Sequence, residues 1–321
     1  MPAALYYDPV YTDGLSPEAR FPRERYRLLR AELGRRGVDA RTPIRPSPPV
    51  AIADLLTAHD PAYVEAFLEG RLDEAAARRI GLRPWTDRIV ERTLKILGGS
   101  VAATRALFEE GFDRAGNLAG GTHHAFGADG AGYCVFNDVA VAARVAQRDH
   151  GIQRVLVVDL DVHQGDGTAA LFADDPSVFT FSIHCARNFP FRKQRSDLDV
   201  ALPDDTEDEA YLSALDAHLP RLLDEVSPQL VIYQAGVDPL AEDHLGRMAL
   251  SRRGLDARNR RVLASTRERA MPLLVLMGGG YARPIERSVE ALGDLFEAVA
   301  ESDEATPPAS APGLPGRPGG R

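Results

Sequence analysis

Three ionisable side chains recur at every second position directly after a short apolar run. The run 155–158 is Val-Leu-Val-Val, and Asp159, Asp161 and His163 follow it before a glycine-rich turn. In an extended chain, residues two positions apart point the same way, so the three side chains face one direction. Burying them is costly without a counter-charge, and carboxylate and imidazole are normal zinc ligands. A polar strand end built from turn residues is the alternative, but a histidine in phase with two aspartates favours a metal site.

Two adjacent histidines, His123 and His124, follow a Gly-Gly-Thr turn. Near a metal ion such a pair can share general-base and general-acid duty, because the pKa of histidine is close to neutrality. A surface histidine pair in a loop is the alternative. Of the eight histidines in the chain, these two, His163 and His184 all fall in its central third. That concentration favours the catalytic interpretation.

Two further apolar runs end in residues that could complete the site. The run Leu230–Gln234 is followed after three residues by Asp238, a candidate third metal ligand, although an Asp-Pro turn explains it equally well. The run 274–277 leads into three glycines and Tyr281. The tyrosine hydroxyl could donate a hydrogen bond to a developing oxyanion, and a glycine-rich turn with a packing tyrosine is the alternative.

A glycine-rich segment at 130–138 could line a narrow channel. It contains Gly132 and Tyr133 and continues to Asn137. Glycine permits close approach of the backbone. A loop that enters a helix at Asn137 explains the same residues equally well.

Positioning these residues requires strands and helices in alternation. The apolar runs are continuous, as expected of strands that are covered on both faces, and helical patterns separate them. This alternation predicts an α/β fold with a single open, mostly parallel sheet, helices on both faces, and ligands beyond the carboxyl ends of the strands. The predicted strands are 4–7, 155–158, 178–183, 230–234 and 273–277, and the predicted helices are 16–35, 61–69, 87–108, 137–147, 208–225, 251–269 and 285–298.

Length and composition set the domain organisation. The chain has 321 residues, of which 44% are hydrophobic and 26% are charged, as in ordinary globular proteins. We predict one catalytic domain over residues 1–300. Residues 301–321 are rich in proline, glycine and alanine and are predicted to be a disordered tail.

Charge and cysteine content exclude several classes of partner. The 38 Lys and Arg residues against 47 Asp and Glu residues give a net charge of −9, the opposite of what non-specific nucleic-acid binding needs. No apolar run approaches the roughly 20 residues of a membrane helix. With only Cys134 and Cys185, a disulfide framework is not expected, which favours the cytoplasm.

Taken together, the motifs resemble the histone deacetylase superfamily of zinc-dependent amidohydrolases, in the arginase/deacetylase fold. The resemblance runs from Leu5 to about Phe296 and includes Gly-Gly-Thr-His-His, Asp-Leu-Asp-Val-His-Gln-Gly-Asp-Gly, Gly-Val-Asp-Pro-Leu and Gly-Gly-Gly-Tyr in the family's order. The stretches 188–191 and 238–246 are most similar to the class IV branch and its bacterial relatives.

The resemblance implies a role for each candidate residue. The implied roles are Asp161, His163 and Asp238 for Zn²⁺; His123 and His124 as the base/acid pair; Asp159 and Asp166 to orient them; Tyr281 for the oxyanion; Gly132, Tyr133 and Phe189 for the acyl-lysine channel; and Asp159, Asp161, His163, Ser182 and Ile183 for a possible K⁺. Many relatives also hold the substrate backbone with a rim aspartate, for which Asp60 and Asp87 are the candidates here.

The function expected from this resemblance is zinc-dependent hydrolysis of an N-acyl lysine-type amide, releasing a carboxylate and a free amine. The substrate would be an acyl-lysine peptide or protein, or an acylated polyamine as for an acetylpolyamine amidohydrolase. A non-catalytic acyl-lysine binding protein is the alternative from another class, but it should lack the tyrosine or a histidine. An arginase-type enzyme would need extra carboxylates where His124 and Pro239 stand.

Overall fold

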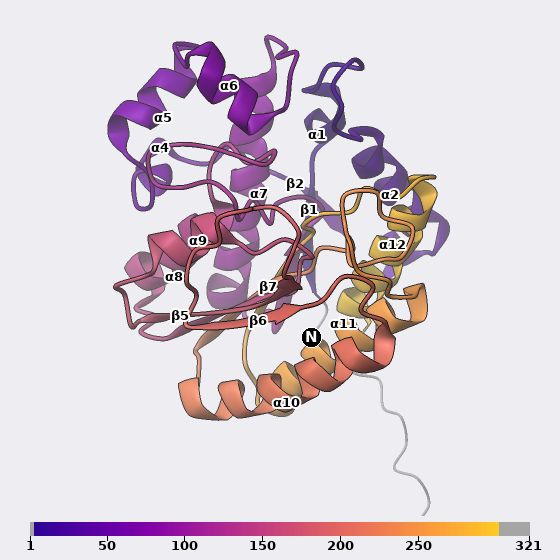
Figure 1. Cartoon of the computed structure of the whole chain (residues 1–321). Coiled ribbons are helices and arrows are strands. Elements are labelled where there is room, and N and C mark those ends of the chain that lie inside the picture. The colour runs from indigo at the N-terminus through magenta and orange to yellow at the C-terminus, as the bar shows by residue number, and fades with distance from the viewer. Residues whose placement is uncertain (1–2, 302–321) are drawn as a thin grey trace, which may run out of the picture.

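The computed structural model describes residues 3–301, and its centre is an eight-stranded sheet (Figure 1). The strands are β1 (Ala4–Tyr7), β2 (Ile44–Pro46), β3 (Arg114–Asn117), β4 (Val155–Asp159), β5 (Val178–Cys185), β6 (Leu198–Leu202), β7 (Leu230–Gln234) and β8 (Leu273–Leu276). Their order across the sheet is β2-β1-β3-β8-β7-β4-β5-β6, and every pairing is parallel. The predicted α/β class is confirmed. The predicted tail, from residue 302 on, lies outside the described residues.

Helices connect the strands. They are α1 (Val10–Asp13), α2 (Glu24–Arg35), α3 (Val38–Arg41), α4 (Ile52–Leu55), α5 (Pro61–Leu68), α6 (Glu74–Ile80), α7 (Ile89–Glu109), α8 (Asp138–His150), α9 (Asp166–Leu171), α10 (Asp208–Val226), α11 (Arg252–Glu268) and α12 (Glu286–Ala300). Within residues 3–301, none of them combines the length and apolar character that a bilayer crossing requires.

One predicted helix boundary is wrong. Ser16 and Pro17 suggest a helix start, but α2 begins only at Glu24. The Ser16 hydroxyl accepts a hydrogen bond from the Glu18 N–H at 3.2 Å and caps no more than a local turn. Serine followed by proline also favours the start of a turn, so this pattern does not distinguish a turn from a helix start.

The sheet is buried on both faces, as the continuous apolar runs predict. In β4, Val155 and Val157 belong to an apolar cluster with side chains of α7 and α8, whereas Leu156 and Val158 belong to a second cluster that includes side chains of α10 and α11. Figure 1 shows the same division, with α7 and α8 on one side of the sheet and α10, α11 and α12 on the other.

The strand register determines which side chains meet at the carboxyl edge of the sheet. β4 lies between β7 and β5, with Asp159 opposite Gln234 on one side and Ser182 on the other. β8 lies on the far side of β7, and β3 beyond β8. Because all these strands are parallel, the chain segments that follow them leave the sheet at one edge, where ligands are expected.

Candidate active site

A buried group of three metal-ligand side chains lies beyond the ends of β4 and β7. Asp161 and His163 follow β4, and Asp238 follows β7. One oxygen or ring nitrogen of each lies within 4.8 Å of the others, and His163 Nδ1 is 3.0 Å from Asp161 Oδ1 and 3.2 Å from Asp238 Oδ2. The structure thus brings together the three side chains that the sequence predicts as zinc ligands.

The chemistry of this cluster fits a divalent metal ion. Burial raises the pKa of Asp238, and the charge of Asp161 raises it further, to about 7. Burial lowers the pKa of His163, but hydrogen bonds to the two carboxylates outweigh burial and raise this pKa to about 10. Two buried carboxylates with oxygens within 4.8 Å of each other repel, and a cation between them stabilises both negative charges. Carboxylate oxygens and an imidazole nitrogen are also a normal zinc donor set, so these residues fit zinc.

Groups from β7 and the turn after β8 hold Asp161 in place. Its Oδ2 accepts hydrogen bonds from the Gly279 N–H and the Gln234 side-chain amide, both at 2.9 Å. A Cβ on Gly279 would lie 1.9 Å from Asp238 Oδ2, so only glycine allows this close approach. Gln234 is not among the predicted site residues, although it ends a predicted strand.

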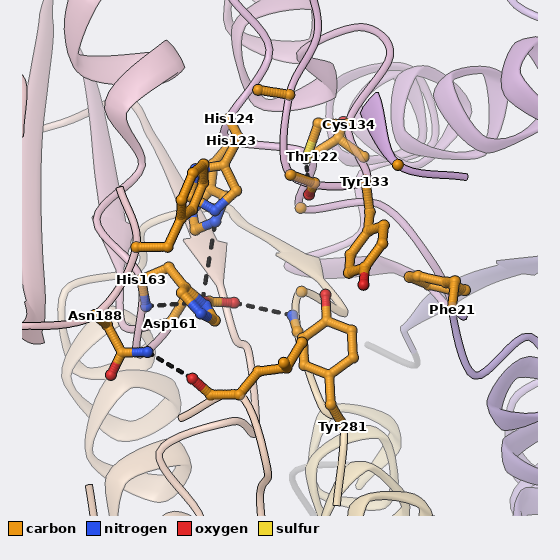
Figure 2. Close-up of a pocket in the computed structure, with 18 of the residues that line it drawn as sticks. Phe21, Thr122, His123, His124, Tyr133, Cys134, Asp161, His163, Asn188 and Tyr281 are labelled. Atoms are coloured by element: carbon orange, nitrogen blue, oxygen red, sulfur yellow. Dashed lines mark hydrogen bonds and ion pairs between the residues drawn. The ribbon is translucent and has the colours of Figure 1, made fainter. Parts of the chain in front are cut away.

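Each of the two adjacent histidines is paired with its own carboxylate. His123 Nδ1 lies 2.7 Å from Asp159 Oδ2, and His124 Nδ1 lies 2.6 Å from Asp166 Oδ1. An ionised carboxylate only accepts hydrogen bonds, so each Nδ1 carries a proton and each Nε2 is left for the cavity. The ring centroids are 4.1 Å apart. Figure 2 shows both rings beside the cluster that contains His163.

The surroundings shift the pKa values of the two rings in opposite directions. Burial lowers the pKa of His123, but the charges of Asp159 and Asp161 outweigh burial and raise this pKa to about 9. For His124, burial and then the charge of His123 lower the pKa to about 4. Neighbouring groups with separated pKa values are typical of acid/base sites, where one group is protonated and the other is neutral.

A carboxylate that the sequence analysis missed fixes the turn before the histidines. Asp138, at the start of α8, accepts hydrogen bonds from the N–H groups of Gly121 (3.2 Å) and Thr122 (2.7 Å) and from the Thr122 hydroxyl (2.6 Å). Gly120 and Gly121 have φ of +78° and +74°, values that favour glycine. The acidic residue at a predicted helix start was the only signal, and it is equally expected at an ordinary helix N-terminus.

Tyr281 contributes a hydroxyl to the same cavity. Figure 2 shows the hydroxyl directed into the cavity, and the residue is 8% exposed. The Asp243 carboxylate accepts a hydrogen bond from the Tyr281 N–H, and the His244 ring contacts the Tyr281 carbonyl. Burial raises the pKa of the phenol well above its usual value, so the hydroxyl stays protonated and can donate. Asp243 and His244 are not among the predicted site residues.

A cavity of about 720 Å³ connects these groups with the surface. Gly132, Tyr133 and Phe189, the residues predicted to form a channel, all border it. The Phe189 ring packs edge-on against the His124 ring, with centroids 4.9 Å apart. A Cβ on Gly132 would lie 2.7 Å from the His124 ring, so glycine keeps the channel wall close to the histidine pair.

The two aspartates considered for the rim lie elsewhere. Asp60 is the N-cap of α5, where its carboxylate accepts the N–H groups of Ala62 and Tyr63. Among the described residues that border the cavity, neither Asp60 nor Asp87 occurs. The structure therefore does not support Asp60 or Asp87 as a rim residue. For Asp60, the following proline indicates a helix start instead, because proline is favoured at the first helical position.

The residues considered for a potassium ion lie in β4, in the turn after it and in β5. Ser182 is opposite Asp159 in the register of β4 and β5, and Ile183 follows it. The Ser182 hydroxyl is 2.9 Å from His184 Nδ1. The potassium site stays a prediction.

A fully buried arginine ties together the two strand ends that carry the metal-ligand cluster. Arg258 of α11 is 0% exposed, and its guanidinium donates hydrogen bonds to the carbonyl oxygens of Leu160 (3.0 Å) and Gly236 (2.7 Å). Leu160 immediately precedes Asp161, and Gly236 lies two residues before Asp238. Arg258 therefore fixes the spacing between ligands from different strands. In the sequence it is one of many arginines on an amphipathic helix, which gave no signal.

We expect Arg258→Met to weaken metal binding about 10- to 100-fold, the usual range when a group that positions a ligand is lost. It should also lower the free energy of unfolding by about 2–4 kcal/mol, because buried carbonyls lose their donors. Metal titration and urea unfolding measure the two effects. Arg261→Met is the matched control on the same helix, where Arg261 pairs with exposed Asp216, and it should change stability by less than about 0.5 kcal/mol. Unchanged metal affinity in folded Arg258→Met protein would contradict the positioning role.

Known proteins share much of this sequence. Residues 19–294 match the family model described as the histone deacetylase domain. An uncharacterized protein of Picosynechococcus sp. is 46% identical over 281 residues, which cover 88% of this chain and 93% of that protein. The histone deacetylase-like amidohydrolase of Pseudomonas aeruginosa is 30% identical over 284 residues, covering 83% and 72%. Histone deacetylase 2 of Arabidopsis thaliana is 36% identical over 205 residues, covering 62% of this chain and 52% of the plant protein, so the match spans about half of that relative.

Proposed function

Because the chain belongs to the histone deacetylase family, we propose that it is a zinc-dependent amidohydrolase that removes acyl groups from lysine-type amines. The family and the relatives named as a deacetylase and an amidohydrolase support hydrolysis of the deacetylase type. One observation carries the proposal further. Asp161 and His163 of the metal-ligand cluster, the two carboxylate-paired histidines and the buried phenol of Tyr281 all border one cavity. We assign the catalytic domain to residues 1–300, and the two buried, free cysteines favour a cytoplasmic location.

In this proposal Asp161, His163 and Asp238 hold the zinc ion. When bound, zinc supplies a Lewis acid for the amide carbonyl and lowers the pKa of water at the site. The hydrogen bonds from Gly279 and Gln234 keep Asp161 in position for this role.

The histidine pair moves the protons. One Nε2 accepts a proton from the attacking water, and the other ring donates a proton to the nitrogen of the leaving amine. Asp159 and Asp166 hold the two Nδ1–H groups, so they keep each Nε2 directed at the cavity. The opposite pKa shifts of the two rings suit this division, since the reaction needs one acceptor and one donor.

The remaining residues bind and orient the substrate. The Tyr281 hydroxyl donates a hydrogen bond to the carbonyl oxygen as negative charge develops on it. Tyr133 and Phe189 present aromatic faces to the aliphatic stem of the acylated side chain and exclude water from it.

The test is hydrolysis by the purified, zinc-loaded chain of peptides that carry acetyl-, butyryl- or myristoyl-lysine, and of acetylated polyamines. Amine release is measured with and without a chelating hydroxamate. We expect hydrolysis of at least one acyl-lysine peptide and its loss with the hydroxamate. Binding of acyl-lysine without release of amine would instead support a non-catalytic binding protein, and hydrolysis of polyamines alone would support an acetylpolyamine amidohydrolase.

A further inference from the structure

The solvent end of the active-site cavity is bordered by arginines. Arg79, Arg187 and Arg247 all line it and are exposed. At its inner end, His123, His124, His163 and Asp161 are buried. Among the described residues that border the cavity, Asp161 is the one carboxylate, and it belongs to the metal-ligand cluster. The entrance therefore presents positive charge to an approaching substrate.

These positive charges are only partly neutralised. Arg187 and Arg247 share a single carboxylate, Asp204, at 3.5 Å and 2.9 Å, and their side chains remain 73% and 49% exposed. Arg79 forms no ion pair within residues 3–301. Its carbonyl accepts the Gly132 N–H at 3.1 Å, which fixes Arg79 next to the channel wall. Three guanidinium groups thus face one carboxylate, an excess of two positive charges.

This local charge is opposite in sign to that of the whole chain. The net charge is −9, which by itself would attract cationic partners. At the entrance the arginines reverse that preference, because a charged rim on a cavity with apolar walls concentrates ions of the opposite sign. The parts of the substrate that stay at the entrance while the acylated side chain occupies the cavity therefore meet a positive potential.

Resting on the proposed function, we infer that the substrate is an acylated lysine-type amine with a carboxylate next to it, either from flanking Asp or Glu residues in a peptide or from the α-carboxylate of acyl-lysine itself. An acetylated polyamine would place an ammonium group at the arginines, and a lysine-rich peptide would place several there. Both are disfavoured by like-charge repulsion.

The first experiment compares acetyl-lysine peptides that differ only in the flanking residues, which are Glu, Ala or Arg. We expect kcat/KM to be about 5- to 30-fold higher for the Glu peptide than for the Arg peptide at low ionic strength. The difference should nearly vanish in 1 M salt, where the screening length is about 3 Å. Nα-blocked acetyl-lysine with a free or an amidated carboxyl group distinguishes an α-carboxylate from a flanking side chain as the anionic group.

Reversing the charge of the entrance arginines tests whether they cause the preference for the Glu peptide. Arg79→Glu and Arg187→Glu, alone and combined, should reduce the preference for the Glu peptide and reverse it in the double variant. Arg221→Glu is the matched control, because Arg221 is an exposed arginine of α10 that pairs with Glu225 and does not border the cavity. It changes the net charge as much as either single variant does, and it should leave the preference unchanged.

Binding of labelled peptides to the Tyr281→Phe variant separates charge preference from turnover. The inference would be wrong if the protein hydrolysed the Arg peptide or polyamines as well as or better than the Glu peptide, and if Arg79→Glu and Arg187→Glu did not change this. The proposed function would then still stand. Failure of the zinc-loaded chain to hydrolyse any of the peptides would overturn the proposed function, while the binding series would still report on the charge of the entrance.

Discussion

Tyr281→Phe is expected to reduce kcat about 10²–10³-fold, the usual effect of removing one hydrogen-bond donor from an oxyanion site. The substitution deletes a single hydroxyl that points into the cavity (Figure 2). KM and zinc content should change little, because the hydroxyl is needed most when negative charge develops on the carbonyl oxygen. Steady-state kinetics on an acyl-lysine peptide, together with metal analysis, measure these quantities.

The fold should tolerate this change. The Tyr281 ring packs against Phe21 and Tyr133, with centroids 6.1 Å and 5.9 Å away, and phenylalanine preserves both contacts. Tyr133→Phe is the matched control, since it removes a hydroxyl from the same cavity without removing the proposed oxyanion donor. We expect it to lower kcat less than tenfold. If Tyr281→Phe kept full activity, or if both variants lost activity equally, Tyr281 would not be the oxyanion donor.

Strands with continuous apolar runs could be predicted from the sequence, and the others could not. All five predicted strands are present as β1, β4, β5, β7 and β8. β3 reads Arg-Ala-Gly-Asn and has no apolar run, yet it lies between β1 and β8 in the sheet. Gly116 allows this placement, because Leu5 and the Phe296 ring approach it so closely that a Cβ would lie 3.2 Å and 3.1 Å from them. Its strand conformation is set by neighbours distant in sequence, which no local pattern reports.

Long helices could be predicted from the sequence, and short helices could not. Six predicted helices correspond within a few residues to α5, α7, α8, α10, α11 and α12, and the predicted helix 16–35 is confirmed only from Glu24 on. The helices that were missed, α1, α3, α4, α6 and α9, have between four and seven residues. A helix of two turns or fewer shows no complete period of apolar residues, and its stability comes from the contacts around it.

The site could be predicted where its residues form compact motifs. Asp159, Asp161 and His163 repeat with the period of a strand, and the histidine pair is contiguous, so their chemistry is visible locally. Asp243 and Arg258 could not be predicted, because each forms hydrogen bonds with the backbone of a distant segment. Asp243 binds the N–H of a residue 38 positions away, and Arg258 binds a carbonyl 98 positions away. Such contacts exist only once the strands have assembled.

Asp238→Asn is expected to abolish zinc binding and to lower turnover by at least about 10³-fold, because the Lewis acid contributes several kcal/mol to the barrier reduction. The amide oxygen of the new side chain can still accept the hydrogen bond that the Val162 N–H now donates to Asp238 Oδ1 at 2.9 Å, so the variant should fold. The pKa of Asp238 is raised to about 7 even beside protonated His163, so its negative charge is unfavourable in the folded state, and removing it relieves repulsion when no metal ion is added. In chelator the variant should therefore be at least as stable as the wild type.

Thermal unfolding with and without zinc distinguishes the wild type from Asp238→Asn. A ligand that binds only the folded state at 100 times its Kd adds about 2.7 kcal/mol, so the Tm of the wild type should rise with zinc and that of Asp238→Asn should not. Asp216→Asn, an exposed change on α10, is the matched control and should keep the full zinc response. A normal zinc-dependent rise in Tm for Asp238→Asn would show that the metal is held elsewhere. Loss of activity together with unchanged or higher stability in chelator is the result expected of a site that holds two buried carboxylates for a metal ion. Repulsion between the carboxylates favours metal binding, and it destabilises the folded state when the metal is absent.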